Sequence, residues 1–529
     1  MSDDNPAQPV TTFETVGPEG PASTGRRRTV IAGVAVAVVA VLGGGAYAAY
    51  ALLFGGGPQP ADVLPASTVA VVSVDLDPSA GQKIAAIRSI RKIPALKKSL
   101  GLHTDDDLRE FLFDKVVHAS GCTSLDFDRD VLPWLGKRGA VAAVDLGETN
   151  PTPAIALQIE DQAEARKGFQ ALVDCTDPQD FAFAVGEDYL IASDSAAHAQ
   201  AILAGGVRKP LADDASYQRW TGEAGDAGVL GFYVAPRAGE YAQDLLDQLG
   251  ADLLGIGGGA LTPGGGQDPL AAAGKALRDF KGLAGTIRFN GGGMELSVAT
   301  GGITQLEDLA TVGTQMGDLP SDTAVALGFG VTRDYAKRLV DQLSESDVSA
   351  AEDETGLDLP GDLQTLLGKA VTLSLGGDAP DSLESLAGPQ DIPAGLVIHG
   401  DADRIKALVG TLEDHLGLNL ADVPVEVDAS GDKVALSTGG YGPSLLKNGS
   451  LGSADDFRDA VPHADEASAI LFLDFDSKWR DALAAALDND QDPGRFADFD
   501  ANTRPLRSLG VSSWQDGDVT HALVKVTTN

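Results

Sequence analysis

Two Ser-x-x-Lys segments are the clearest candidates for nucleophilic chemistry in this sequence. Ser89–Lys92 (SIRK) and Ser444–Lys447 (SLLK) have the spacing with which a lysine can activate a serine in penicillin-recognising enzymes. Neither is accompanied by a Lys-Thr-Gly box, and the sequence also has no HExxH, GxSxG or phosphate-binding-loop motif. We therefore predict no catalytic residue and a protein that is not an enzyme.

Acidic runs suggest calcium binding, but they lack the other residues that a calcium loop needs. In 488–494 (DNDQDPG), Pro493 stands where an EF-hand requires glycine, and Phe499 stands where its bidentate glutamate should be. The run 126–130 (DFDRD) has neither residue, and the seven histidines are scattered without the spacing of ligand pairs. We interpret these runs as solvated acidic loops and predict no metal and no cofactor.

One basic stretch contrasts with the acidity of the chain. Between Ser79 and Thr104 there is no acidic residue, and Ile84, Ile87 and Ile90 place an apolar stripe on the expected helix. Its six cations, candidates for contact with an anionic lipid or wall surface, are Lys83, Arg88, Arg91, Lys92, Lys97 and Lys98. The alternative, which we favour, is that they balance nearby acids such as those of 105–107.

The whole chain of 529 residues carries a formal charge of −38, nearly all of it beyond residue 60. Such a surface repels phosphate backbones, so we predict no nucleic-acid partner. Abundant alanine, glycine and aspartate with little lysine are typical of actinobacterial proteins. An acidic, solvated surface suits an exported, extracellular protein.

Residues 29–54 contain no charge and follow three arginines, which is the pattern of a transmembrane helix. By the positive-inside rule, residues 1–28 form a cytoplasmic tail, which we expect to be disordered, and the bulk of the chain is extracytoplasmic. The predicted location is thus the cell membrane, with a single-pass anchor. A signal peptide cleaved after Ala46–Ala48 is the alternative.

The chain has two cysteines, Cys122 and Cys175, and both lie in the region predicted to be exported. Outside the cytoplasm such a pair tends to oxidise, so a structural disulfide is favoured over two free thiols.

The exported chain repeats itself. A proline, an alternating strand and a helix begin at Pro65 and again at Pro320, and five further elements recur in the same order. This predicts repeat A over 61–302 and repeat B over 317–529. Gly-acid turns between strands favour antiparallel pairing, so the expected fold is α+β, with curved antiparallel sheets and helices packed on one face. Asp161 and Asp401 are the expected helix N-caps.

Two segments resemble an uncharacterised bacterial family, domain-of-unknown-function family 3352. They are the segment 64–94, directly after the apolar stretch, and the segment 126–144 (DFDRDVLPWLGKRGAVAAV). The residues that match the family pattern are Asp75, Asp77, Pro78, Gln82, Pro133, Trp134 and Gly136. The resemblance implies a membrane-tethered exported protein and no catalytic residue. We interpret the matching residues as structural, with Trp134 buried in a turn.

We therefore expect an envelope protein that binds or assembles without catalysis. Its partner would be an envelope lipid, a wall polymer or a membrane protein. A lipid or polyprenol carrier is the alternative, followed by a cell-wall hydrolase or transferase whose site is not recognisable from sequence.

Overall fold

The computed structural model of the chain describes residues 15–16, 58–75, 109–110, 113, 124–175, 182–241, 279–290, 293–302, 309–378, 386, 388–417, 424–488 and 499–529. The chain divides into two compact units. Unit 1 comprises Met1–Lys83, Leu102–Gly259 and Gly282–Ile287, and unit 2 comprises Ile84–Gly101, Ala260–Lys281 and Arg288–Asn529.

Unit 1 is built on an antiparallel sheet. Its strands are β1 (Thr15–Val16), β2 (Thr68–Asp75), β3 (Leu135–Val144), β4 (Thr152–Ile159), β5 (Ala182–Val185), β6 (Tyr189–Ser193), β7 (Leu230–Val234) and the first part of β8 (Gly282–Asn290). The pairings give the order β1-β5-β6-β4-β3-β2-β7-β8. Its helices are η1 (Pro60–Asp62), the π-helix η2 (Phe127–Val131), α5 (Gln162–Cys175), α6 (Ala196–Arg208), η3 (Leu211–Asp213) and α7 (Ala215–Glu223).

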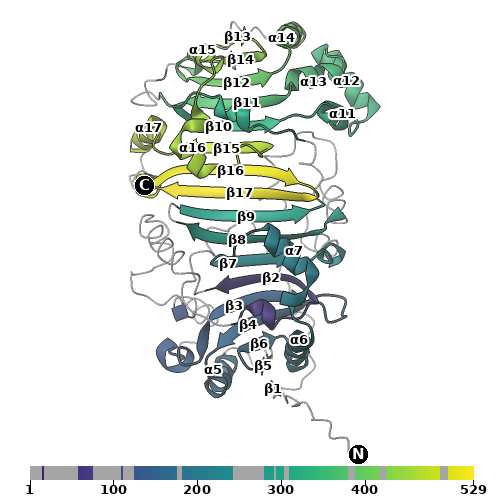
Figure 1. Ribbon diagram of the computed structural model, residues 1–529, viewed down its shortest axis with the longest axis vertical. Coiled ribbons are helices and arrows are strands. Elements are labelled where there is room, and N and C mark those ends of the chain that lie inside the picture. Colours follow the sequence, from purple (N-terminus) through teal and green to yellow (C-terminus); the bar gives the residue numbers. More distant parts are fainter. Residues whose placement is uncertain are drawn as a thin grey trace, which may run out of the picture. The chain divides into compact units, whose positions relative to one another are not determined.

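The strands of unit 2 are also antiparallel, and Figure 1 shows them in teal, green and yellow. Its strands are β9 (Gly293–Gly301), β10 (Thr323–Gly330), β11 (Ala370–Gly376), β12 (Ala394–His399), β13 (Glu426–Ser430), β14 (Lys433–Ser437), β15 (Ala469–Asp474), β16 (Leu506–Asp516) and β17 (Val519–Thr528). Their order is β13-β14-β12-β11-β10-β15-β16-β17-β9.

The helices of unit 2 lie between these strands along the chain. They are α10 (Gly313–Gly317), α11 (Tyr335–Val340), α12 (Glu345–Thr355), α13 (Gly361–Leu367), η6 (Pro389–Asp391), α14 (Ala402–Leu416), α15 (Gly442–Leu445), η7 (Leu451–Ser453), α16 (Asp455–Ala460) and α17 (Lys478–Asp488). Figure 1 shows α16 in front of β15 and α14 beside β13 and β14.

The strand orders of the two units correspond. Strands β5-β6-β4-β3-β2-β7-β8 of unit 1 occupy the same places as β13-β14-β12-β11-β10-β15-β16 of unit 2. The turns before the first strands also match. Thr68 donates its hydroxyl to the carbonyl of Pro65 at 2.7 Å, and Thr323 donates to Pro320 at 2.7 Å. In both units the ladder is irregular directly after this threonine.

Local signals in the sequence formed as predicted. Asp161 accepts a hydrogen bond from the backbone N–H of Glu164 at 2.8 Å, and Asp401 accepts one from Arg404 at 3.2 Å, so both aspartates cap their helices. The hairpin β16–β17 turns at Gly517, whose φ of 58° suits glycine. All the strand pairings described are antiparallel, as expected.

The prediction that helices pack on one face is wrong for unit 2. On one face, α10, α15, η7 and α16 enclose a core that includes Phe457, Phe472 and Leu451. On the other face, α14 packs Ile405 and Val409 against β12 and β14. At β12 and β14 apolar side chains lie on both faces of the sheet, and helices cover both faces there.

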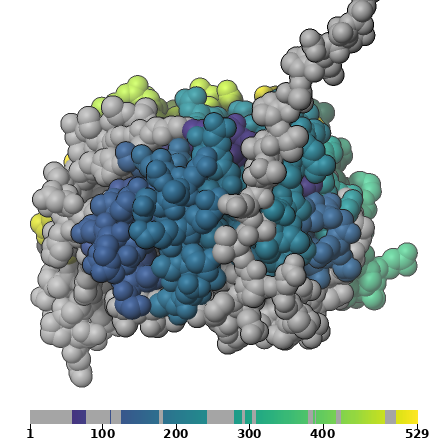
Figure 2. Space-filling view, turned by 90° about the horizontal axis from the view of Figure 1, so that it is seen from below, coloured from purple at the N-terminus to yellow at the C-terminus, as the bar shows by residue number. Residues whose placement is uncertain are grey.

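In unit 1, α5 and η2 pack on the strands at the β5 edge. Phe169 of α5 contacts the rings of Trp134 and Phe183, with ring centroids 6.3 and 5.0 Å apart. Trp134 is 3% exposed and donates its indole N–H to the carbonyl of Asp130 at 2.7 Å, which confirms that it is buried in a turn. Figure 2 shows this end of unit 1 from outside, with residues 124–175 and 182–241 in blue to teal.

The predicted transmembrane segment, residues 29–54, lies outside the described residues. No helix within the described ranges combines the length and apolar character needed to cross a bilayer. In the N-terminal segment 1–28, the structure describes Thr15–Val16, which pair with Phe183 and Ala184 of β5.

Candidate functional site

A row of aliphatic side chains runs across the sheet of unit 2. Directly opposed residues of antiparallel strands place their side chains on the same face, so the register of each pair defines this row. From β9 to β11 its members are Leu296, Val524, Val511, Leu471, Leu327 and Leu373. Leu396 of β12 continues it.

A second and a third row flank the first, two residues away along each strand. One contains Met294, Val526, Leu509, Leu473, Val325 and Leu375, and the other contains Val298, Ala522, Ser513, Ala469, Phe329 and Val371. We call these three rows the aliphatic face. Its described members include no charged side chain, although the whole chain carries a formal charge of −38.

The aliphatic face is open at its centre. Leu327 and Leu373 are 44% and 47% exposed, and their neighbours in the middle row are partly exposed. On the same strands the alternate residues are buried, with Ala326 0% and Thr372 1% exposed. The solvent-exposed side of this sheet is therefore as apolar as its buried side, which is unusual for an antiparallel sheet with one wet face.

Small residues explain which face the helices cover. A Cβ added to Gly328 would lie 2.5 Å from the Sδ of Met316 in α10, so any larger residue there would force the Met316 side chain to move. Gly510 of β16 is in similarly close contact with the carbonyl of Ala460 in α16. The large residues Val325, Leu327 and Phe329 alternate with the small ones and lie on the opposite face.

The aliphatic face has defined limits at two of its sides. At the β12 side, Leu396 and Leu436 pack against α14. Helix α17 lies at one end of the strands. Its Trp479 donates the indole N–H to the carbonyl of Gly376 at 2.7 Å and so holds the helix there. Lys478 also pairs with Asp378 at 2.8 Å.

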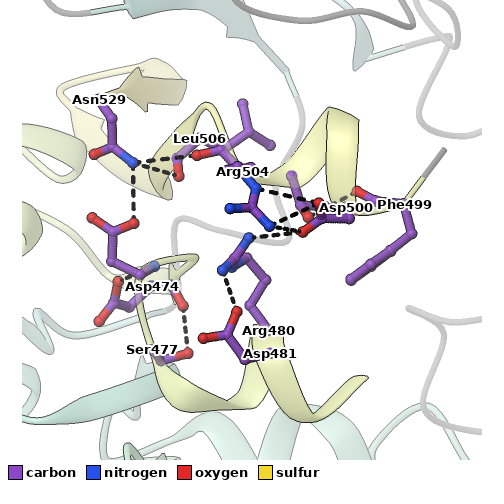
Figure 3. Close-up of polar contacts among 11 residues, drawn as sticks. Asp474, Ser477, Arg480, Asp481, Phe499, Asp500, Arg504, Leu506 and Asn529 are labelled. Carbon is purple, nitrogen blue, oxygen red and sulfur yellow. Dashed lines mark hydrogen bonds and ion pairs between the residues drawn. The ribbon is translucent and has the colours of Figure 1, made fainter. Parts of the chain in front are cut away.

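A polar network continues from α17, as Figure 3 shows. Arg480 and Arg504 converge on Asp500, with N–O distances of 3.4 and 2.8 Å, and Arg480 also pairs with Asp481. The side-chain amide of Asn529 donates to Asp476 at 3.1 Å. In this network the cations are paired with carboxylates of the same network, so it fixes α17 in place rather than presenting a free charge to a ligand.

Asp474, at the end of β15, is the acid of this region with the most unusual environment. Burial and the carboxylate of Asp456 raise its pKa, against the stabilising hydrogen bond that the backbone N–H of Asp476 donates at 2.9 Å. A raised carboxyl pKa is a property of catalytic acids, but also of structural clusters. No described nucleophile lies in hydrogen-bond contact with the Asp474 carboxylate in the structure.

Two polar features of unit 1 have structural explanations. Asp75, which matches the family pattern, pairs with the buried Arg138 at 3.0 Å. In the run 126–130, Asp126 caps η2 by accepting the backbone N–H of Arg129 at 3.0 Å, and the Asp130 carboxylate accepts that of Asp126 at 2.9 Å. The predicted solvated loop is therefore a capped helical turn, because its carboxylates satisfy backbone donors.

Most of the site residues predicted from sequence lie outside the described residues. This holds for Cys122 and for all six cations of the basic stretch, Lys83, Arg88, Arg91, Lys92, Lys97 and Lys98. Cys175 ends α5 and is disulfide-bonded. Ser444 belongs to the short helix α15 and Lys447 follows it. No group of three histidine, cysteine or acidic residues in the described ranges could hold a metal ion.

The aliphatic face was missed because its strands were interpreted as ordinary strands with one buried side. A signal was present: in Thr323–Gly330 (TAVALGFG), large residues alternate with alanine and glycine. Such a strand is apolar on both faces, which indicates a second apolar surface without showing which one the helices cover.

Comparison with known proteins gives a family but no activity. Residues 31–184 match the family model described as protein of unknown function (DUF3352), which confirms the resemblance found in the sequence. No curated protein and no solved structure matches the chain.

Proposed function

Because residues 31–184 belong to the DUF3352 family, whose description states no activity, we propose a function from the aliphatic face: the protein is a non-enzymatic, membrane-anchored envelope protein that binds an apolar partner there. The observation that supports this most directly is the exposed pair Leu327 and Leu373 at the centre of an uncharged face. Contiguous apolar side chains exposed on a protein surface often mark a binding site.

The proposal includes the topology expected from the sequence. An anchor at 29–54 would keep the two units outside the cytoplasm and close to envelope lipids. It would also place Thr15–Val16 and β5 on opposite sides of the bilayer. The β1–β5 pairing and this anchor therefore exclude each other within one chain, and the proposal requires that the pairing is absent from the inserted protein.

Internal duplication is also part of the proposal. The matching strand orders and the matching Thr68 and Thr323 hydrogen bonds support it. A duplicated scaffold supplies a wide sheet without requiring a catalytic centre.

The test is native mass spectrometry and lipid extraction on the full chain purified from its own membrane. We expect the wild-type chain to carry a bound lipid. The double variant Leu327→Asp/Leu373→Asp should retain at least about tenfold less lipid than the wild-type chain. A hydrocarbon that covers a carboxylate removes its water and offers no hydrogen bond in return.

The matched control is Leu343→Asp/Leu416→Asp, which changes two leucines of unit 2 that are 40% and 41% exposed but lie outside the aliphatic face. The control should keep its lipid. A wild-type chain that carries no lipid, or a control that loses it equally, would contradict lipid binding at this face.

A further inference from the structure

The geometry of the aliphatic face also indicates how its ligand lies. The middle row follows the strand-to-strand direction from Leu296 to Leu373 in unbroken register. These six strands are separated by five intervals of about 4.8 Å, so the row is roughly 24 Å long. Along the strands, the three rows cover only about 13 Å, two steps of two residues.

The row is closed at one end. Beyond Leu373, the next member is Leu396, which packs against α14 through the cluster that contains Ile405 and Val409. A ligand that lies along the row therefore meets the side of α14 at the β12 end. From there the row runs towards Leu296 on β9.

The chemistry of the three rows selects the class of ligand. Ser513 is the only described member that has a side-chain hydrogen-bonding group. A protein partner brings polar groups that need hydrogen-bond partners once they are buried, and typical protein interfaces supply about one hydrogen bond per 100–200 Å². A hydrocarbon chain has no such groups, so it leaves no hydrogen bond unmade when it is buried on this surface.

Resting on the proposed function, we propose that the ligand is a single long hydrocarbon chain that lies across the strands along the middle row, with its apolar end against α14. The row of roughly 24 Å exceeds the depth of one leaflet, which is half of a hydrocarbon core of about 30 Å. The face therefore suits a chain longer than that of an ordinary membrane phospholipid, such as a polyprenyl chain or a very long acyl chain.

A tryptophan scan tests this arrangement. Leu373→Trp, Leu327→Trp and Leu471→Trp each place a bulky indole in the row, at successive strands away from α14. The full chain is delipidated by detergent exchange and incubated with saturated fatty acids from dodecanoic to tetracosanoic acid, and bound chains are identified by native mass spectrometry. Leu343→Trp, at an exposed position between α11 and α12 and outside the face, is the control.

We expect the wild-type chain to prefer the longest acids. Because each indole blocks the row at a different strand, the preferred acid should become shorter from Leu373→Trp to Leu327→Trp to Leu471→Trp, while the control keeps the wild-type profile. Thermal unfolding checks that each variant is folded. We expect Leu327→Trp and Leu373→Trp to fold, because both positions are exposed.

Other outcomes separate the two proposals. If the three variants lose all acids equally, binding at the aliphatic face stands but the placement across the strands is overturned. If their profiles equal that of the wild-type chain, the acids bind elsewhere and both proposals are overturned. A wild-type chain that binds no acid would also overturn both, leaving a protein partner or another segment of this chain as the cover of the face.

Discussion

Leu327 of β10 and Leu373 of β11 are directly opposed across the sheet, and both are nearly half exposed, at 44% and 47%. One residue away from the middle row on β15, Ile470 is 1% exposed and belongs to the core beneath the helices. Apolar side chains thus lie on both faces of one sheet, but in opposite environments.

This difference predicts the effect of substitutions on stability. Leu327→Thr and Leu373→Thr should each lower the free energy of unfolding by less than about 1 kcal/mol, because they weaken a cross-strand contact between half-exposed side chains and leave no enclosed cavity. Ile470→Ala should lower it by about 2–5 kcal/mol, since it leaves a cavity. Urea unfolding measures all three; a large loss for either threonine variant would mean that the aliphatic face is covered in solution.

His399 predicts a dependence of stability on pH. Burial, followed by the charge of Lys433, lowers the pKa of His399 from 6.5 to about 4 in the folded protein. Between these values the unfolded chain binds a proton that the folded chain does not. The stability contribution is therefore complete above pH 6.5 and is lost as the pH falls towards 4, by up to about 3 kcal/mol.

The variant His399→Asn should flatten this part of the stability profile. Its matched control is His415→Asn, at an exposed position of α14, which should leave the profile unchanged. Thermal unfolding between pH 4 and pH 7 compares them. Equal slopes for the wild-type chain and His399→Asn would show that His399 is protonated in the folded state.

Asp474 should make the stability change with pH in the opposite direction from His399. Burial and Asp456 raise its pKa above 3.8, so the folded protein holds this proton more firmly than the unfolded chain. Stability is therefore gained as the pH falls through the raised pKa, and ionisation at neutral pH is a cost. Asp474→Asn should stabilise the protein at pH 7 and should give no gain below the folded pKa.

The measurement is chemical unfolding at pH 7 and pH 4, with Asp465→Asn, an exposed acid, as the control. If Asp474→Asn destabilised the protein at pH 7, the charged carboxylate would have to make a favourable interaction in the folded state, which would contradict the prediction.

The disulfide prediction concerns Cys175, which is disulfide-bonded, and the other cysteine of the chain, Cys122. A bond between them would close a loop of 175 − 122 = 53 residues and contribute about 4 kcal/mol through the entropy of the unfolded chain. The double variant Cys122→Ser/Cys175→Ser should lose stability of this order. Mass analysis of the unreduced, denatured chain after alkylation should show no label; two labels per chain would exclude the bond.

The sequence by itself determined the local structure of this protein. Alternating strands, Gly-acid turns and the capping residues Asp161 and Asp401 act over a few residues, so they could be predicted without knowledge of the fold. The recurrence of the elements that begin at Pro65 and Pro320 is likewise visible in the sequence, but the strand order that both units share comes from the structure. The family resemblance depended on the same kind of local pattern.

Only the tertiary structure decided which face of the sheet is open. In Thr323–Gly330 both faces are apolar, so hydrophobicity alone favours neither, and the larger residues would be expected in the core. The structure places the helices on the face of Ala326 and Gly328, because small side chains allow backbones to approach closely, and leaves Leu327 exposed on the other. The register that aligns Leu327 with Leu373 and Leu471 is set by pairing between strands far apart in the chain, which no local pattern encodes.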